Sequence, residues 1–369
     1  MSDQVPADAR RRLALVTGVA GQDGRHLTAR LLKAGYLVHG TVRPSGETRP
    51  TALASSEALV IHHLDLEHPS AYANLIATLK PDEVYNLGGM SSVAASFADP
   101  ETAWRTSADA VEAMLEAVRR HTPGTRFYQS SSSEMFGTIP GQDARHDADA
   151  PLRPQSPYAA AKAAAHLLCG AYRRAFHLRI ACGILFNHES SFRPSTFLTR
   201  KVVDHLRALQ AATPRTRRTM APLAMGNMAA KRDWGFAPDY VDGMVRIMNQ
   251  IEVRSAILGH PPEEDIGANY RDYVLGTGTA HAVWELVDRA YTLAGFPLEW
   301  DRTDQESEWS ARLEGTATVA VVVDPQLLRP ADPATIVADP SRATAELAWQ
   351  PRIGLDPFLR EMLEAEADG

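Results

Sequence analysis

The sequence predicts an α/β protein: a Rossmann-type, doubly wound parallel sheet followed by a smaller C-terminal α/β substrate lobe. Three observations predict it. Short β-branched runs alternate with amphipathic stretches through the first half, a glycine-rich turn follows the first run, and the alternation breaks after about Phe186. We therefore expect a dinucleotide-binding domain over residues 10–186. Residues 187–369 should form mainly the substrate lobe, with some segments returning to the first domain.

The predicted strands follow one another along the first half of the chain. They are residues 13–17, 37–42, 59–65, 83–88, 126–131 and 179–186, with the sequences LALVT, LVHGTV, LVIHHLD, EVYNLG, RFYQSS and RIACGILF. Amphipathic stretches between them, such as RHLTARLLKAG and SADAVEAMLEAVRRH, predict helices on both faces of the sheet. In the second part, residues 254–272 are predicted to form a loop.

The composition is that of an ordinary globular protein of 369 residues, 44% hydrophobic and 22% charged. A net charge of −7 without a long basic block argues against nucleic acid as a partner. The two cysteines, Cys169 and Cys182, make neither a disulfide framework nor a metal-ligand spacing, which favours the cytoplasm and predicts no metal. No window reaches 18 uninterrupted apolar residues and no apolar signal segment occurs, so we expect neither secretion nor membrane insertion.

A glycine-rich turn joins the first predicted strand to the first helix. Gly18, Gly21 and Gly24 stand in LVTGVAGQDG, and residues without Cβ allow a tight turn and the close approach of a pyrophosphate at a helix N-terminus. Glycines also serve plain turns, so the position at the first strand–helix junction is what favours a dinucleotide.

The end of the second predicted strand indicates which dinucleotide binds. Arg43 stands where an acidic residue would bind a free ribose 2′-hydroxyl, and arginine suits a 2′-phosphate, so we expect NADP rather than NAD. An exposed loop arginine is the alternative. Asp65 is placed either to meet the adenine or to cap a helix beginning near Ser70.

A candidate acid–base pair lies in SPYAAAKAAAHLL. Tyr158 and Lys162 are four residues apart and so on one face of a helix. An ammonium group near a tyrosine lowers the phenol pKa and favours the phenolate as a base. Such pairs are usual on helix surfaces, and the place of this one after the fifth strand is what favours chemistry.

The stretch FYQSSSSEMFG, residues 127–137, supplies the other polar groups. A serine run is typical of a solvated loop, and Ser-x-x-Glu is typical of a helix cap. The run nevertheless follows the fifth strand, and open α/β sheets bind ligands at the carboxyl ends of their strands. We therefore expect Ser132 to bond a substrate hydroxyl and Glu134 to act as a second acid–base group.

Together these motifs resemble the GDP-mannose 4,6-dehydratase family of the extended short-chain dehydrogenases/reductases. The resemblance runs from about Leu13 to Trp349, in the same order and spacing. It is carried by TGVAGQDG, YNLGGMSSVAASF, FYQSSSSEMFG, SPYAAAK, GILFNHES, FLTRKV, GNMAAKRDWGFAPDYV and LLRPAD.

The resemblance implies conversion of GDP-mannose to GDP-4-keto-6-deoxymannose with tightly bound NADP. Tyr158 would remove the O4 proton while C4 gives a hydride to NADP+, with Ser132 and Lys162 assisting. Glu134 would then abstract the C5 proton, water would leave from C6, and the hydride would return to C6. The family also implies a homodimer, or a homotetramer.

The resemblance further implies which residues bind the cofactor and the substrate. For the cofactor these are Gly18, Gly21, Gln22, Asp23, Gly24, Arg43, Asp65, Leu66, Leu87, Tyr158, Lys162 and His188. For the sugar and diphosphate they are Ser91, Ser133, Asn187, Glu189, Lys201, Arg232, Arg329 and Asp332. For Lys201 and Arg329 an ordinary ion pair is the alternative.

Three positions depart from the family pattern. Ser132 replaces a threonine, GGMSSV replaces GAQSHV at residues 88–93, and the loop after Arg43 and Pro44 differs. Two other hypotheses stay open. One is a 4,6-dehydratase of another nucleotide sugar, such as a GDP-heptose, and the other is a catalytically inactive NADP-binding homologue.

Overall fold

The computed structural model describes residues 10–44, 56–137, 145–259, 261–328 and 334–365. The chain divides into two compact units. Unit 1 comprises residues 1–131, 160–183 and 244–272, and unit 2 comprises residues 132–159, 184–243 and 273–369. The two units differ in their bounds from the predicted division after residue 186: residues 132–159 belong to unit 2 and residues 244–272 belong to unit 1.

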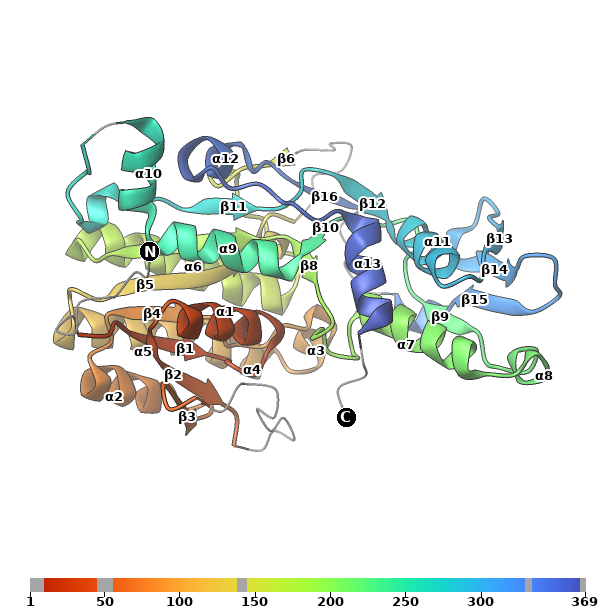
Figure 1. The fold of residues 1–369 in the computed structure, drawn as a ribbon, viewed down its shortest axis with the longest axis horizontal. Helices are drawn as coiled ribbons and strands as arrows, with labels where there is room; N and C mark the ends of the chain where they lie inside the picture. Colours follow the sequence, from red (N-terminus) through yellow and green to blue (C-terminus); the bar gives the residue numbers. More distant parts are fainter. Residues whose placement is uncertain (1–9, 45–55, 138–144, 260, 329–333, 366–369) are drawn as a thin grey trace, which may run out of the picture. The chain divides into compact units, whose positions relative to one another are not determined.

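Unit 1 is built on a sheet whose strands run in the order β7-β5-β4-β1-β2-β3 (Figure 1). The strands are β1 (Leu13–Thr17), β2 (Leu37–Val42), β3 (Leu59–His63), β4 (Glu83–Asn86), β5 (Arg126–Ser132) and β7 (Ile180–Leu185). Pairing is parallel from β5 through β4, β1 and β2 to β3. β11 (Tyr273–Leu275) pairs with β7, whose last two residues also belong to unit 2.

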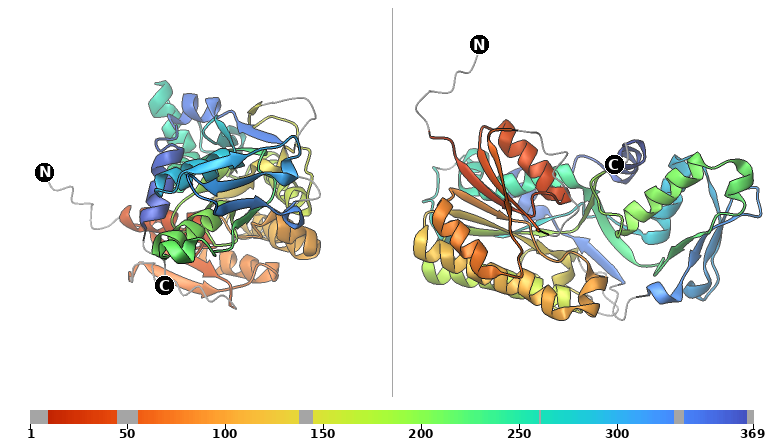
Figure 2. Two further views of the ribbon diagram at one scale, coloured as in Figure 1. Left: turned by 90° about the vertical axis from the view of Figure 1, so that its right-hand side faces the viewer. Right: turned by 90° about the horizontal axis from the view of Figure 1, so that it is seen from below.

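Helices cover both faces of this sheet, with α1 on one side and α5 and α6 on the other (Figure 2). The helices of this part are α1 (Gln22–Lys33), α2 (Pro69–Leu79), α3 (Val93–Ala98), α4 (Pro100–Trp104), the π-helix η1 (Arg105–Asp109), α5 (Ala110–His121), α6 (Pro157–Phe176), α10 (Gln250–Leu258) and the 3₁₀-helix η3 (Gly267–Asn269). The prediction of a doubly wound parallel sheet is confirmed.

The core of unit 1 follows from the helical period of these sequences. In α5, Val111, Met114, Leu115 and Val118 are buried, at the i, i+3, i+4 and i+7 spacing of one helix face. They pack in one cluster with side chains of α2, α6 and the sheet, such as Phe127. Each fully buried aliphatic side chain contributes about 1.5–3 kcal/mol to folding.

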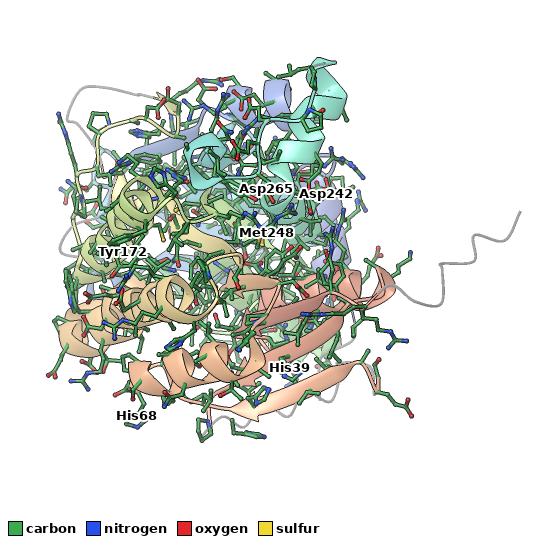
Figure 3. All side chains as sticks on the ribbon, turned by 90° about the vertical axis from the view of Figure 1, so that its left-hand side faces the viewer. His39, His68, Tyr172, Asp242, Met248 and Asp265 are labelled. Carbon is green, nitrogen blue, oxygen red and sulfur yellow. The ribbon has the colours of Figure 1, made fainter. Side chains whose placement is uncertain are left out.

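The prediction of a loop over residues 254–272 is wrong for its first residues, 254–258, which are helical. Helix α10 continues to Leu258 and ends at Gly259, whose φ of 68° is left-handed. The sequence pattern does not predict this helix, because the apolar residues do not all lie on one buried face. The last of them, Leu258, is exposed, so the apolar positions do not follow an amphipathic period. The rest of the segment is held to unit 1 by Asp265 (labelled in Figure 3), which accepts hydrogen bonds from Arg126 at 3.2 Å and Tyr270 at 2.8 Å.

Unit 2 contains two further sheets. One has the order β12-β10-β16-β6, with β8 paired to β10, and the other has the order β13-β14-β15-β9. The strands are β6 (Arg145–His146), β8 (Asn187–Glu189), β9 (Leu223–Met225), β10 (Lys231–Phe236), β12 (Ala280–Ala282), β13 (Leu298–Asp301), β14 (Ser310–Leu313), β15 (Val319–Val323) and β16 (Thr335–Ala338).

The helices of unit 2 complete its core. They are η2 (Ser133–Met135), α7 (Leu198–Ala211), α8 (Pro214–Arg217), α9 (Ala237–Met248), α11 (Val283–Leu293), η4 (Glu306–Glu308), η5 (Pro325–Leu327), α12 (Ser341–Leu347) and α13 (Leu355–Glu364). Side chains of α7, α11 and α13 share one apolar cluster with β9, β14 and β15. Across the described part of the chain, no helix combines the length and apolarity needed to cross a membrane.

Candidate active site

The glycine-rich turn between β1 and α1 takes a conformation that requires glycine. Gly18 has a φ of 68°, and the Gly21 amide donates to its carbonyl at 3.0 Å. A Cβ on Gly24 would come within 2.3 Å of the same carbonyl oxygen. Helix α1 begins at Gln22 directly after the turn, so its N-terminus lies at this point, as pyrophosphate binding needs.

The other cofactor residues predicted in unit 1 meet around this turn. The hydroxyl of Thr17 accepts hydrogen bonds from the amides of Leu87 at 3.0 Å and Gly88 at 2.8 Å, which ties the end of β4 to the end of β1. A Cβ on Gly88 would lie 2.8 Å from a methyl group of Leu66. The ends of β1 and β4 are therefore closely packed beside the turn, with Leu66 in contact range of Gly88.

Arg43 and Asp65 lie together beyond the ends of β2 and β3. The Arg43 Nε and an Asp65 carboxylate oxygen are 3.9 Å apart, and the Arg43 side chain is 62% exposed. Asp65 does not cap the next helix, because α2 begins at Pro69 with His68 as its N-cap. Its carboxylate instead accepts from the Glu67 amide at 3.0 Å, and this turn ends β3 at His63, before the predicted end.

Ser132, Glu134 and Tyr158 come together in unit 2. Ser132 is the last residue of β5, and its hydroxyl accepts from the Glu134 amide at 3.3 Å. The side chain of Ser132 also forms a hydrogen bond with the Tyr158 hydroxyl. Ser132 and Tyr158 are buried, whereas Glu134 is half-buried. Two hydroxyls and a carboxylate thus share one small space.

The surroundings of Tyr158 disfavour its anion in the free protein. Burial raises the pKa of the Tyr158 phenol to about 12, the hydrogen bond of Ser132 lowers it, the Glu134 charge raises it, and the Arg193 charge lowers it. Arg193 is a residue that sequence reasoning missed. Its signal was a basic residue four positions after Glu189 in the distinctive NHES segment.

Lys162 is buried one helical turn after Tyr158 on α6 and donates to the carbonyl of Ser130 at 3.0 Å. Burial lowers the pKa of Lys162 to about 8, although the charge of Asp23 raises it. Asp23 lies in the first turn of α1, so the glycine-rich turn and the lysine are linked electrostatically within unit 1.

The NHES segment forms β8 in unit 2. Nδ1 of His188 lies 2.7 Å from the carbonyl oxygen of Phe186, and its ring stacks on that of Tyr240 at 4.5 Å between centroids. Glu189 meets two protein groups at one carboxylate oxygen: Arg193 Nε lies 3.0 Å away and the Thr199 hydroxyl donates at 2.5 Å. The buried Glu189 therefore links Arg193 to Thr199.

The remaining predicted substrate residues differ in exposure. Ser133 and Arg232 are buried, Asn187 is half-buried, and Ser91 and Lys201 are exposed. The Arg232 side chain donates to the carbonyl of Lys231 at 2.9 Å. Arg329 and Asp332 lie outside the described residues.

Comparison with known proteins shows the family of the chain. The family model described as GDP-mannose 4,6 dehydratase matches residues 15–362. The chain is 33% identical to GDP-mannose 4,6 dehydratase 2 of Arabidopsis thaliana, covering 97% of this chain and 87% of the relative. It is 34% identical to GDP-mannose 4,6-dehydratase of Vibrio cholerae, covering 97% of this chain and 94% of the relative.

Solved structures share the fold at lower identity. One is dTDP-glucose 4,6-dehydratase from Bacillus anthracis in complex with NAD, with a TM-score of 0.71, 17% identity and coverage of 96% of each chain. Another is RMD from Pseudomonas aeruginosa complexed with NADPH, with a TM-score of 0.68, 20% identity and coverage of 95% of this chain and 97% of that one.

Proposed function

Because this chain belongs to the GDP-mannose 4,6-dehydratase family, we propose that it converts GDP-D-mannose to GDP-4-keto-6-deoxy-D-mannose with NADP as its cofactor. The observation that carries the proposal is the hydrogen bond between Ser132 and Tyr158 with Glu134 beside them. A dehydratase needs two acid–base groups for two neighbouring carbons. A simple reductase or epimerase has no need of Glu134.

The residues of unit 1 fit a dinucleotide. A Cβ on Gly24 or Gly88 would collide with protein atoms, so both glycines allow the turn and the end of β4 to pack closely beside the N-terminus of α1. We assign the pyrophosphate to residues 18–24 and the adenosine end to Arg43 and Asp65. The exposed guanidinium of Arg43 supports NADP, since it is able to pair with a 2′-phosphate.

The catalytic roles follow from the environment of each group. NADP, when bound, accepts a hydride from C4, returns one to C6, and by the positive charge of its nicotinamide favours the Tyr158 phenolate. Tyr158 removes the O4 proton, and Ser132 donates a hydrogen bond to the same oxygen. Arg193 supplies positive charge that stabilises the phenolate, and Lys162 is assigned to the cofactor. Arg193 is held for this role by Glu189.

Glu134 serves the second half of the reaction. Once C4 is a ketone, the C5 proton is acidic, and the half-buried Glu134 carboxylate removes it while water leaves from C6. Asn187, Lys201 and Arg232 are assigned to the sugar and diphosphate, with Arg329 and Asp332 as proposed contacts outside the described residues. Charge-assisted bonds from arginine and lysine suit a diphosphate.

We also propose that the protein is a homodimer joined through α5 and α6. Leu167 and Phe176, both on α6, are 60% and 46% exposed, which is unusual for large apolar side chains on one helix. An open groove on the same unit is lined by Asp109 of η1, by Glu112, Ala113, Glu116, Arg119 and Arg120 of α5, and by Tyr172 (labelled in Figure 3) and Phe176 of α6. A second copy of this face would bury both apolar residues.

The test of the proposed activity is mass spectrometry of GDP-mannose incubated with the purified protein and no added cofactor. The expected product is lighter by one water. An unchanged substrate contradicts the proposal and supports an inactive homologue. Faster dehydration of a GDP-heptose would move the assignment to another GDP-sugar, and equal rates with UDP- or dTDP-hexoses would remove the GDP specificity.

A further inference from the structure

A polar cluster around His166 lies on helix α6 beyond the two residues assigned to catalysis. Tyr158, Lys162 and His166 follow at intervals of four, so they occupy one face of the helix at successive turns. His166 is half-buried. Side-chain atoms of His166, Cys182 of β7 and Asp272 all lie within 4.8 Å of one another.

Each of these helical turns is bonded to a different serine at the end of β5. Nδ1 of His166 lies 3.1 Å from the hydroxyl oxygen of Ser131. Ser131 stands between Ser130, whose carbonyl accepts from Lys162, and Ser132, which bonds Tyr158. We call these three contacts the serine contacts: Tyr158 with Ser132, Lys162 with the Ser130 carbonyl, and His166 with Ser131. The first two involve groups assigned to the reaction, and the third does not.

The Asp272 carboxylate near His166 is fixed in place. Arg173 binds both oxygens of Asp272, at 2.6 Å each, and the Cys182 amide donates to the same carboxylate at 2.7 Å. Burial raises the pKa of the Asp272 carboxyl, but the hydrogen bond and charge of Arg173 outweigh this effect and lower it. An anion therefore lies near His166.

Resting on the function proposed above, we propose that His166 is a positioning residue that orients Ser131. It thereby holds the end of β5 in register with α6, so that the other two serine contacts form. The hydrogen bond between His166 and Ser131 affects the contacts of Ser130 and Ser132, because the three serines are consecutive in one buried strand. In such a strand, a rotation of the backbone at one residue moves its neighbours.

The protonation state of His166 decides the direction of the Ser131 hydroxyl. Neutral imidazole protonated at Nε2 accepts from Ser131 at Nδ1, whereas imidazolium donates to Ser131. Burial lowers the pKa of His166, but the hydrogen bond of Cys182, whose own thiol is kept neutral by burial, and the charge of Asp272 outweigh it and raise the pKa to about 9. The titratable and charged groups around it are Lys162, Cys169, Arg173, Cys182 and Asp272. Deprotonation at alkaline pH therefore reverses the hydrogen bond to Ser131.

The test compares three substitutions of His166 that differ in which ring nitrogen they replace. His166→Asn keeps a polar atom near the Nδ1 position and so the bond to Ser131, His166→Gln keeps one near the Nε2 position, and His166→Phe keeps neither. We expect kcat with GDP-mannose to fall about tenfold in the Phe and Gln variants with KM unchanged, the scale of one hydrogen bond. The Asn variant should stay within about threefold of the wild type. His205→Phe, at a half-buried histidine of α7, is the matched control and should leave kcat unchanged.

Two further readouts separate positioning from a general loss of structure. Ser131→Ala should lower kcat as much as His166→Phe, and the double variant should be no worse than either, because both remove the same contact. The kcat profile of the wild type should show one alkaline transition more than that of His166→Asn, in which position 166 cannot titrate whereas Lys162 still does. Wild-type kcat in His166→Phe, additive losses, or identical profiles would overturn the proposal.

A wrong assignment of the activity is distinguished from a wrong role of His166, because in the first case the wild type itself leaves GDP-mannose unchanged. In that case, hydrogen–deuterium exchange of residues 126–137 tests the positioning role without substrate. Exchange should be faster in His166→Phe and His166→Gln than in His166→Asn and the wild type, and equal exchange overturns the role. One equivalent of zinc that copurifies with the wild type but not with His166→Phe would assign the cluster as a metal site and likewise overturn it.

Discussion

The hydroxyl groups of Ser132 and Tyr158 are hydrogen-bonded to each other although the two residues stand 26 positions apart, one at the end of β5 and one in the first turn of α6. A sugar hydroxyl placed between them would meet a base and a hydrogen-bond donor at once. In the proposed reaction the pair would fix the position of the oxidised carbon, C4, and Glu134 would lie beside its neighbour, C5.

Substitution of the two acid–base groups, Tyr158 and Glu134, should stop the reaction at different steps. Tyr158→Phe should abolish the reduction of bound NADP+ on mixing with GDP-mannose, because no base removes the O4 proton. In Glu134→Gln, the substrate should still reduce the cofactor, but the reaction should stop before elimination. The absorbance of bound NADPH should therefore rise and persist. Stopped-flow absorbance and exchange of the C5 proton in deuterated water measure the two steps. Full C5 exchange in Glu134→Gln would mean that another residue is the second base.

The cofactor preference should depend on Arg43. Arg43→Asp places a negative charge where we assign the 2′-phosphate, beside Asp65, and should weaken retention of NADP far more than that of NAD. Identifying the nucleotide released from the denatured protein measures this. Arg30→Asp, in the last turn of α1, is the control and should change neither. Recovery of NAD alone from the wild type would contradict the role given to Arg43.

Lys162 should reduce stability while supporting activity. Its folded pKa of about 8 lies below the ordinary 10.5, so the unfolded chain binds the proton more tightly between these values and stability rises with pH there. Lys162→Met should raise the free energy of unfolding at pH 7 by roughly 1–3 kcal/mol while abolishing turnover. The Ser130 carbonyl keeps its bond from Gln129 at 2.9 Å. The gain should shrink between pH 8 and 10.5, as thermal melts at several pH values would show; a constant gain would contradict the pKa argument.

The glycine-rich turn should not tolerate a methyl group at its third position. Gly24→Ala puts a Cβ 2.3 Å from the Gly18 carbonyl oxygen and should cost roughly 1–3 kcal/mol of stability, with loss of bound nucleotide. Gly124→Ala, where no heavy atom lies within 4 Å of the new Cβ, is the control. Nucleotide content and urea unfolding report both effects. Retention of nucleotide by Gly24→Ala would show that the turn is not the pyrophosphate site.

The assembly should depend on the exposed face of α6. Leu167→Glu places a charge at a side chain that is 60% exposed in the single chain, so it should be harmless to folding but should separate a dimer formed through this face. Light scattering after size exclusion measures the mass. Glu112→Gln, at the same groove without a new charge, should leave the dimer intact. A wild-type monomer, or an unchanged dimer in Leu167→Glu, would contradict the proposed interface.

Local patterns in the sequence determined the sheet, the glycine-rich turn and the shared helix face of Tyr158 and Lys162. These depend on periods of two and 3.6 residues and on backbone conformations open only to glycine, so they can be read from neighbouring residues. The same reasoning failed for α10, because a helix with exposed apolar residues has no such period.

What only the tertiary structure decided is which distant groups face the reactive side chains, and how strongly they are buried. Arg193 acts on Tyr158, Glu189 is engaged by Arg193, and His166 meets Ser131. No spacing in the sequence predicts these contacts, because they depend on the pairing order of the strands and on the packing of α6. The pKa of a buried phenol or ammonium depends in turn on the loss of water around it, which is a property of the whole fold rather than of any local stretch.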